Sequence, residues 1–194
     1  MQAKNILSSV TLASLLAIAG NTQAFSLSPG AVEANLNNET LQFEVERSFG
    51  GNLSLNAGFL YTEEHDAGSA TLGQVGFQGV ETDNRTYRAA IGARAYFYST
   101  PDSDTGSALA FGGLFYHVIP GAQRLSAGGY GWIAPKVTSF GSTEQFYEAG
   151  GRVAYRVIQN TDVFAGYRYT YLKRDDGFDE SFESGPHLGF RINF

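Results

Sequence analysis

The sequence predicts an all-β fold, an antiparallel transmembrane β-barrel that follows a cleaved N-terminal signal peptide. Three observations lead to this prediction. Apolar and polar side chains alternate along repeated stretches, aromatic residues gather near the ends of those stretches, and the polar rows carry Arg and Glu where a water-facing sheet would carry Lys. The composition agrees, because 24 glycines, 15 Phe and 11 Tyr beside a single Met suit closely spaced strands.

The N-terminal segment has the pattern of a signal peptide. Lys4 precedes an uncharged apolar stretch at 6–19, and the small residues of 22–24 suit cleavage directly after them. The apolar stretch is shorter than the roughly 20 residues that a membrane-spanning helix needs. We therefore expect a signal peptide at 1–24 and an outer-membrane β-barrel at 25–194. The chain has no Cys, so neither disulfides nor a lipidated Cys can contribute.

Clusters of Gly, Asn, Asp, Ser and Pro divide the remaining chain into ten predicted strands, because these residues favour turns. An even count places both ends of the barrel on the periplasmic side. Pro135 makes the seventh strand the weakest, since proline cannot donate a ladder hydrogen bond. If that stretch is a loop and another, such as 31–37, also drops out, the barrel has eight strands. The ten predicted strands are 31–37, 40–48, 52–62, 70–82, 85–99, 107–119, 126–138, 144–158, 162–174 and 184–194.

In the first half of the chain, the strands at 40–48 and 85–99 show the alternation most clearly. Successive side chains of a strand point to opposite faces, so one row would face lipid and the other the lumen. The predicted lipid-facing residues are Leu41, Phe43, Val45, Tyr87, Ala89, Ile91, Ala93, Ala95 and Phe97. The predicted lumen residues are Gln42, Glu44, Glu46, Arg88, Gly92, Arg94 and Tyr96.

In the second half, the strands at 144–158, 162–174 and 184–194 repeat the alternation with more charge. The predicted lipid-facing residues are Tyr147, Ala149, Val153, Tyr155, Val157, Val163, Ala165, Tyr167, Tyr169, Tyr171, Leu188, Phe190, Ile192 and Phe194. The predicted lumen residues are Glu148, Gly150, Arg152, Arg156, Gly166, Arg168, Thr170, His187, Gly189, Arg191 and Asn193.

The connections indicate which end of the barrel faces outward. SFGG, TDN and IQN are tight, whereas EHDAGS, TPDSDTG and DDGFDES are longer and acidic. Outer-membrane barrels have short periplasmic turns and longer external loops, so the acidic connections would be external. A water-soluble exported β-sandwich would also alternate, but its outer face would usually be rich in Lys, and this chain has few.

The segment at 129–172 resembles the YfaZ family of small Gram-negative outer-membrane proteins. The resemblance rests on the AP-x-V-x-x-F stretch at Ala134 to Phe140, on a strand containing Tyr and Glu after it, and on GYR at Gly166 to Arg168. It extends to the signal peptide and the strand spacing. The family implies an outer-membrane β-barrel, and it brings neither catalytic residues nor a firmly assigned substrate.

A charged lumen is the candidate functional feature. Ten strands enclose an interior little wider than one that side chains fill, whereas aqueous porins use about 16 to 18. We favour a lumen filled by salt bridges, and a narrow path with weak anion preference is the alternative because the arginines outnumber the acids. The predicted charge network consists of Glu44, Glu46, Arg88, Arg94, Glu148, Arg152, Arg156, Arg168 and Arg191, with Glu33 beside it.

No catalytic, metal or cofactor site is predicted. A lipid-hydrolysing barrel needs a Ser beside a His on the lipid face, and none of His65, His117 and His187 meets that requirement. The acidic clusters lack the spacing of a calcium loop. The chain is acidic, with a formal charge of -6, and has no basic run for nucleic acid. We expect a structural or narrow-channel, porin-like barrel without catalysis. Ligand binding or adhesion through the acidic loops is the alternative, and a lipid hydrolase is the least favoured.

The last strand carries a candidate assembly signal. Its apolar row ends in Phe190, Ile192 and Phe194, which resembles the aromatic ending by which barrel proteins are recognised for assembly. The expected partners are therefore the barrel assembly machinery, outer-membrane lipid and lipopolysaccharide. The expected location is the Gram-negative outer membrane. Nothing in the sequence specifies an oligomeric state or a transported ligand.

Overall fold

The computed structural model describes residues 30–49, 52–65, 68–83, 86–101, 105–174 and 179–194. The predicted signal peptide lies outside these residues. The strands are Gly30–Leu36 (β1), Thr40–Ser48 (β2), Leu53–His65 (β3), Gly68–Asp83 (β4), Tyr87–Ser99 (β5), Thr105–Val118 (β6), Leu125–Ala134 (β7), Ser139–Gly141 (β8), Thr143–Ile158 (β9), Thr161–Arg174 (β10) and Asp179–Asn193 (β11).

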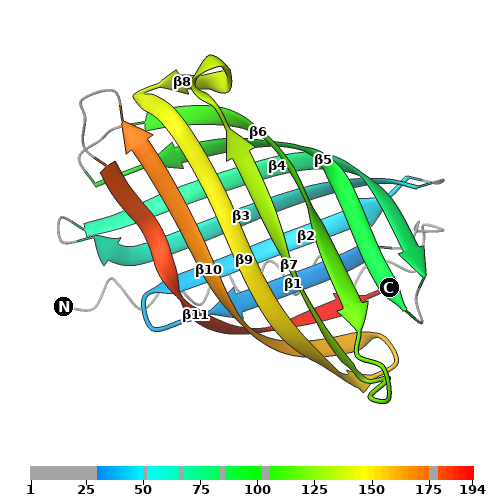
Figure 1. The fold of residues 1–194 in the computed structure, drawn as a ribbon. Helices are drawn as coiled ribbons and strands as arrows, with labels where there is room; N and C mark the ends of the chain where they lie inside the picture. Colours follow the sequence, from blue (N-terminus) through cyan, green and yellow to red (C-terminus); the bar gives the residue numbers. More distant parts are fainter. Residues whose placement is uncertain (1–29, 50–51, 66–67, 84–85, 102–104, 175–178) are drawn as a thin grey trace, which may run out of the picture.

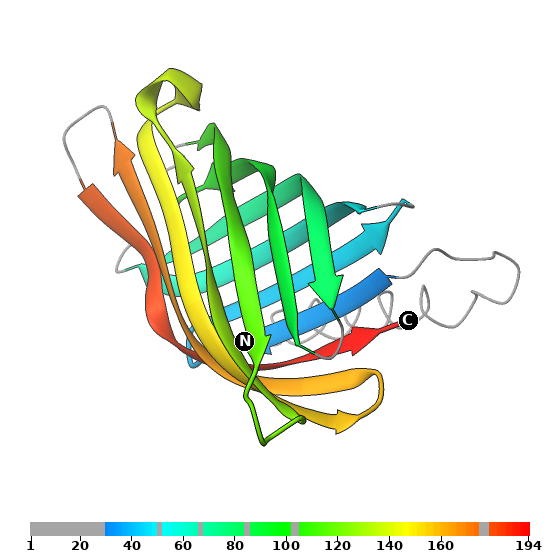
Figure 2. The same cartoon turned by 45° about the vertical axis from the view of Figure 1, so that its right-hand side comes forward.

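Ten of these strands form a closed antiparallel barrel, which confirms the predicted fold and strand number. Each strand pairs with its neighbour along the chain, except that β7 pairs with β9 and leaves the short β8 on the edge of β6. The barrel closes between β1 and β11, where Ala31 lies opposite Asn193 and Leu36 opposite Leu188. Closure leaves no unpaired edge among the ten barrel strands, as a bilayer requires. The tilted strands surround one interior (Figures 1 and 2).

The seventh strand is shorter than predicted. β7 ends at Ala134 rather than at residue 138, because Pro135 cannot donate to the ladder. A 3₁₀ turn, Lys136–Thr138, follows, in which the Thr138 amide donates to the Pro135 carbonyl at 2.9 Å. The shorter strand still pairs with β6 and β9, so it remains one of the ten strands of the barrel.

The predicted contrast between short turns and long loops is only partly correct. β3 and β4 extend until His65 lies opposite Gly68, so most of EHDAGS is strand. β11 begins at Asp179, which is earlier than predicted. The connection after β1 is tight, because the Asn37 side chain accepts hydrogen bonds from the amides of Glu39 and Thr40 at 2.8 and 2.5 Å. Pairing thus continues beyond the predicted strand ends at these connections.

The two faces of the strands are those predicted. On β5, Ile91 is 78% exposed and Phe97 57% exposed, whereas Tyr96 between them in the alternation is fully buried. Large apolar side chains are exposed along the outward rows, such as Val75 and Phe77 on β4 and Val153 and Tyr155 on β9, which suits contact with lipid. No helix of the described chain has the length and apolar character to cross a bilayer.

The barrel has two ends that differ in their connections. The terminal end carries Gly30 and Phe194, whose backbone groups bond to each other at 2.7 and 2.9 Å. The loop end carries the connections after β1, β3, β5, β7 and β10, including the 3₁₀ turn and β8 at the top of Figure 1. The interior is built differently toward each end.

Candidate functional site

An apolar cluster fills the lumen toward the loop end, and we call it the aromatic plug. Its members come from eight strands of the barrel and point inward. Tyr96 and Phe146 lie with ring centroids 4.4 Å apart, and Trp132 is only 2% exposed. The plug consists of Leu60, Ala70, Leu72, Tyr96, Tyr98, Ala108, Ala110, Trp132, Ala134, Phe146, Leu172 and Phe182. Large rings beside alanines fill the cross-section in the way that small barrels pack their interiors.

Glycines in the inward rows make room for the large side chains opposite them. A Cβ at Gly150 would lie 2.7 Å from the ring of Tyr130, which faces it across the ladder. A Cβ at Gly76 would lie 2.7 Å from Cγ of Arg94, its partner on β5. In the sequence these glycines only interrupt the polar row. In the structure, the space that a side chain would take there is filled by the large side chain on the neighbouring strand.

Arg168 and Glu183 form a buried ion pair beside the plug. The guanidinium donates from Nε and Nη2 to the two carboxylate oxygens at 2.6 and 2.8 Å, and both side chains are at most 2% exposed. Arg168 also donates to Gln42 and, at 3.1 Å, to Asn35. A bidentate pair with satisfied neighbours is the form in which buried charges are tolerated.

Sequence reasoning missed Glu183 because it placed the last strand at 184–194. The register between β10 and β11 shifts after Thr170, which pairs with Glu183 while Tyr171 pairs with Ser181. This bulge turns both Phe182 and Glu183 inward, and strict alternation forbids two inward residues in a row. An unmatched Arg168 in the predicted lumen was the available signal that an acid was missing.

Two contacts join the plug to the charged centre of the lumen. The hydroxyl of Tyr96 donates to Glu148 at 2.5 Å, and both residues are buried. The Arg94 guanidinium lies over the Trp132 ring, 4.4 Å from its centroid. Arg94 also bonds to Glu44 at 3.2 Å and to Gln74 at 3.1 Å.

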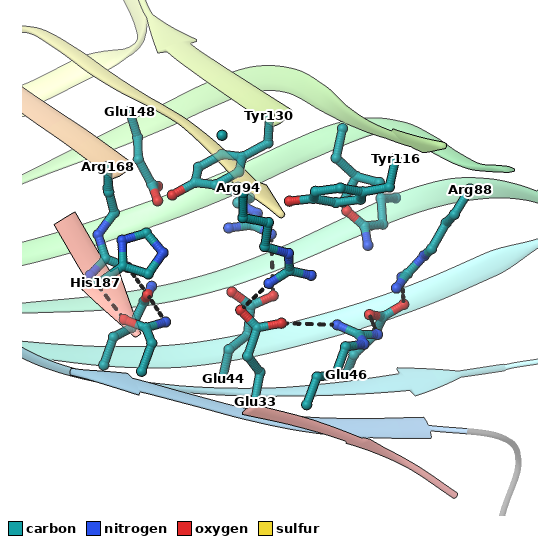
Figure 3. Close-up of a pocket in the computed structure, with 17 residues that line it drawn as sticks. Glu33, Glu44, Glu46, Arg88, Arg94, Tyr116, Tyr130, Glu148, Arg168 and His187 are labelled. Carbon is teal, nitrogen blue, oxygen red and sulfur yellow. Dashed lines mark hydrogen bonds and ion pairs between the residues drawn. The ribbon is translucent and has the colours of Figure 1, made fainter. Parts of the chain in front are cut away.

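The centre of the barrel contains a chain of alternating charges, which we call the arginine–glutamate network. Glu33 accepts from Arg152 at 2.6 Å and from Arg191 at 3.4 Å. Arg191 continues to Glu46 at 2.7 Å, and Glu46 also accepts from Arg88. Figure 3 shows Glu33 and Glu46 on one wall and Arg88 reaching toward Glu46 from the opposite wall. Each acid of this chain bridges two cations, so the strands that carry them are tied together across the lumen.

Arg156 lies apart from this network, although it belongs to the predicted set. It sits near the terminal end, where Nε donates to Asp162 at 2.9 Å, and its side chain is 45% exposed. Asp162, which sequence reasoning did not include, is the second residue of β10 and follows a tight turn. With Asp162 and Glu183 added, the described inward acids equal the inward arginines in number. The charge excess that favoured an anion path is therefore absent from the interior as a whole.

A cavity of about 620 Å³ opens at the terminal end. Gly30, Asn160 and Phe194 lie on its lining, and Arg88, Arg152 and Arg191 separate it from the rest of the lumen. A second cavity, of about 40 Å³, lies within the network. None of the plug residues lines either cavity. The described lumen is thus hollow at one end and filled at the other.

Phe190, Ile192 and Phe194 follow the outward row of β11. They are 42%, 37% and 57% exposed, so their side chains lie on the lipid-facing surface. The role of these three residues in assembly stays a prediction.

The side chain of His65 lies outside what the structure describes, and the other two histidines lie in separate places. His117 Nδ1 contacts the Val118 carbonyl at 2.5 Å, and His187 lies in the lumen at 6.0 Å from the Phe164 ring. Among the described residues, no three His, Cys, Asp or Glu side chains come together as a metal-binding group. Most acidic side chains of the long connections, at 64–67, 102–104 and 175–180, lie outside what the structure describes.

Comparison with known proteins gives one family and several distant structures. The model of the YfaZ precursor family matches residues 3–194. No curated protein matches the sequence. Among solved structures, the chain is similar to the outer-membrane channel DcaP of Acinetobacter baumannii, with 13% identity and a TM-score of 0.43 over 84% of this chain and 54% of that one.

Two further solved structures are similar at the same level. A bacterial polysaccharide outer-membrane secretin has 11% identity and a TM-score of 0.43 over 86% of this chain and 63% of that one. Neisserial surface protein A has 12% identity and a TM-score of 0.38 over 86% of this chain and 94% of that one. The chain therefore spans less than two thirds of the length of the first two.

Proposed function

Since the chain belongs to the YfaZ precursor family of outer-membrane barrels, we propose that it acts as a closed, non-conducting structural barrel of the Gram-negative outer membrane. The observation that carries this proposal is the aromatic plug. Tyr96 and Phe146 are fully buried and Trp132 is 2% exposed, so side chains occupy the lumen near the loop end. A hydrated ion would have to displace these rings to pass, which the close packing of protein interiors opposes.

The charge arrangement supports the same proposal. In the network, Glu33 and Glu46 each hold two guanidinium groups from other strands, and the buried Arg168 holds Glu183 by two hydrogen bonds. A permeating ion needs ligands that release their partners readily, whereas these carboxylates are each held by arginines of other strands. The network thus acts as cross-bracing between distant strands.

We infer no catalytic role. A hydrolase of membrane lipid needs a base and a nucleophile within hydrogen-bond reach on the lipid face. His187 lies inside the lumen, and His117 is bonded to its own strand. The acidic connections leave adhesion as the competing class, and deletion of 102–104 would separate the two. A barrel that folds but loses a binding partner would favour adhesion.

Single-channel recording in a planar lipid bilayer tests the closed barrel. The folded wild-type protein is expected to give no discrete openings. The double variant Tyr96→Ala and Trp132→Ala removes two rings of the plug and is expected to conduct. The matched control, Phe97→Ala and Ile133→Ala, removes outward side chains one position along the same strands, at 57% and 48% exposure, and is expected to stay silent. Discrete openings of the wild type would refute the proposal.

A further inference from the structure

Among the described residues, the cavity at the terminal end is open toward that end and closed by the network and the aromatic plug on its inner side. Its volume of about 620 Å³ falls in the range of roughly 300 to 1,000 Å³ that small-molecule pockets occupy. The aromatic plug fills the lumen on the far side of the network. A molecule that enters from the terminal end would therefore bind and leave by the same mouth. The inner wall of the cavity includes Arg88 and Arg152, which also belong to the network.

The lining of this cavity carries more positive than negative charge. Four arginines line it, Arg88, Arg152, Arg156 and Arg191, against the two acids Glu46 and Asp162. The interior as a whole is balanced because the other four inward acids, Glu33, Glu44, Glu148 and Glu183, do not line the cavity. The separation leaves a positive potential at the terminal end, and a low-dielectric wall strengthens it.

Arg88 and Arg152 have donors to spare at the inner wall of the cavity. Arg88 donates from Nη2 to Glu46, and Arg152 donates from Nη1 to Glu33. Within the described part of the chain these are the hydrogen bonds that each guanidinium makes, out of five N–H groups. Their side chains are 22% and 13% exposed, so both reach the cavity.

Arg152 is also held in place before any ligand arrives. Its guanidinium lies between two aromatic rings, 4.6 Å from the centroid of Tyr116 and 4.4 Å from that of Phe164. Glu33 fixes one end of it at 2.6 Å. A side chain fixed in this way loses little conformational entropy when it binds an anion.

We propose that this cavity binds a small molecule or headgroup through a phosphate or carboxylate group, with Arg88 and Arg152 as the donors. A guanidinium presents a planar pair of N–H groups that matches these oxyanions. The polar wall residues Ser126 and Asn160 face the remainder of the ligand. The proposal goes beyond a structural role and depends only on the open half of the lumen.

Titration of the folded full-length barrel with inorganic phosphate, in zwitterionic detergent, tests this site. Calorimetry is expected to show saturable binding to one site. Arg88→Gln is expected to weaken that binding at least tenfold, while the barrel stays folded because Glu46 keeps Arg191 at 2.7 Å. The matched control is Arg47→Gln, which changes an exposed arginine on the outward row beside Glu46 and is expected to bind as the wild type does.

A second pair of variants tests the cavity without changing its charge. Ala154→Trp places a ring in the cavity and is expected to weaken phosphate binding at least tenfold. Ala149→Trp puts the same ring on the exposed side of the same strand and is expected to have no effect. Repeating the titration in nanodiscs of phosphatidylglycerol or phosphatidylcholine identifies the source of the oxyanion. Competition by the anionic lipid alone would assign a headgroup, and equal binding in both would assign a free solute.

The proposal is overturned if the wild type binds no phosphate saturably, or if Arg88→Gln and Ala154→Trp bind it as the wild type does. Channel activity of the wild type would refute the closed barrel while leaving these titrations unchanged. The two proposals therefore fail separately.

Discussion

The loop half and the terminal half of this barrel are built from the same strands but filled by different chemistry. Toward the loop end the inward rows carry rings, leucines and alanines, with Tyr96 and Phe146 fully buried. Toward the terminal end the same rows carry arginines and acids around a cavity of about 620 Å³. The comparison shows that strand number sets the width of a barrel, whereas the inward row decides whether each level is filled or open.

The difference between a filled and an open lumen also determines how much an ion pair contributes to stability in each half. Arg168 and Glu183 are paired where the surroundings are dry, and Arg156 and Asp162 where water reaches them. A buried charge that loses its partner is costly, while an exposed pair contributes little. Substitutions at the two pairs should therefore differ sharply.

The largest effect is expected for Arg168→Met. The substitution removes the guanidinium that compensates a fully buried Glu183, so the free energy of unfolding should fall by about 3–5 kcal/mol. Urea unfolding in lipid vesicles, followed by tryptophan fluorescence, measures the change. The double variant Arg168→Met and Glu183→Leu should recover part of the loss, because it removes both charges. A loss below about 1 kcal/mol in the single variant would contradict the dry character of this half.

A smaller effect is expected for Tyr96→Phe. The hydroxyl of Tyr96 donates to the buried Glu148 at 2.5 Å, and a hydrogen bond to a charged group contributes about 1.5–3 kcal/mol. Tyr98→Phe is the control on the same strand. Its hydroxyl bonds the neutral Thr143 at 2.9 Å, so its loss should cost about 0.5–1.5 kcal/mol. Equal losses in the two variants would contradict a stronger hydrogen bond at Tyr96 than at Tyr98.

The smallest effect is expected for Arg156→Gln at the terminal end. The side chain is 45% exposed, so water and salt screen its pair with Asp162, and the free energy of unfolding should change by less than about 1 kcal/mol. The same urea titration applies, repeated at high salt to remove the remaining attraction. A loss as large as that of Arg168→Met would erase the contrast between the two halves.

The fold could be predicted from the sequence because the alternation of apolar and polar residues identifies the lipid-facing and lumen-facing rows of each strand. Leu41, Phe43 and Val45 against Gln42, Glu44 and Glu46 specify the faces of β2 with no knowledge of its neighbours. The strand ends were less predictable. Whether EHDAGS stays paired depends on a hydrogen-bonded partner across the hairpin, which a single strand does not reveal.

The sequence predicted which residues face the lumen, but not how deep along the barrel axis each of them lies. Alternation assigns Arg156 and Arg168 to the same row, yet one is exposed and the other is 1% exposed, because their depth depends on the tilt and register of all ten strands. The bulge that turns Glu183 inward breaks the period on which the prediction rests. The aromatic plug was also missed, since Tyr96, Trp132 and Phe146 lie far apart in the chain and meet only when the barrel closes.

The lumen is filled toward the loop end and open toward the terminal end. The chain has no Cys, so single-cysteine variants report on one position at a time. Ala110→Cys lies in the plug at a position that is fully buried, and Ala154→Cys lies on the cavity wall. Labelling of the folded protein with a charged, water-soluble thiol reagent measures access, and labelling in denaturant normalises it. Rapid labelling at 154 with protection at 110 is the expected result, and equal labelling of the two would contradict a closed barrel.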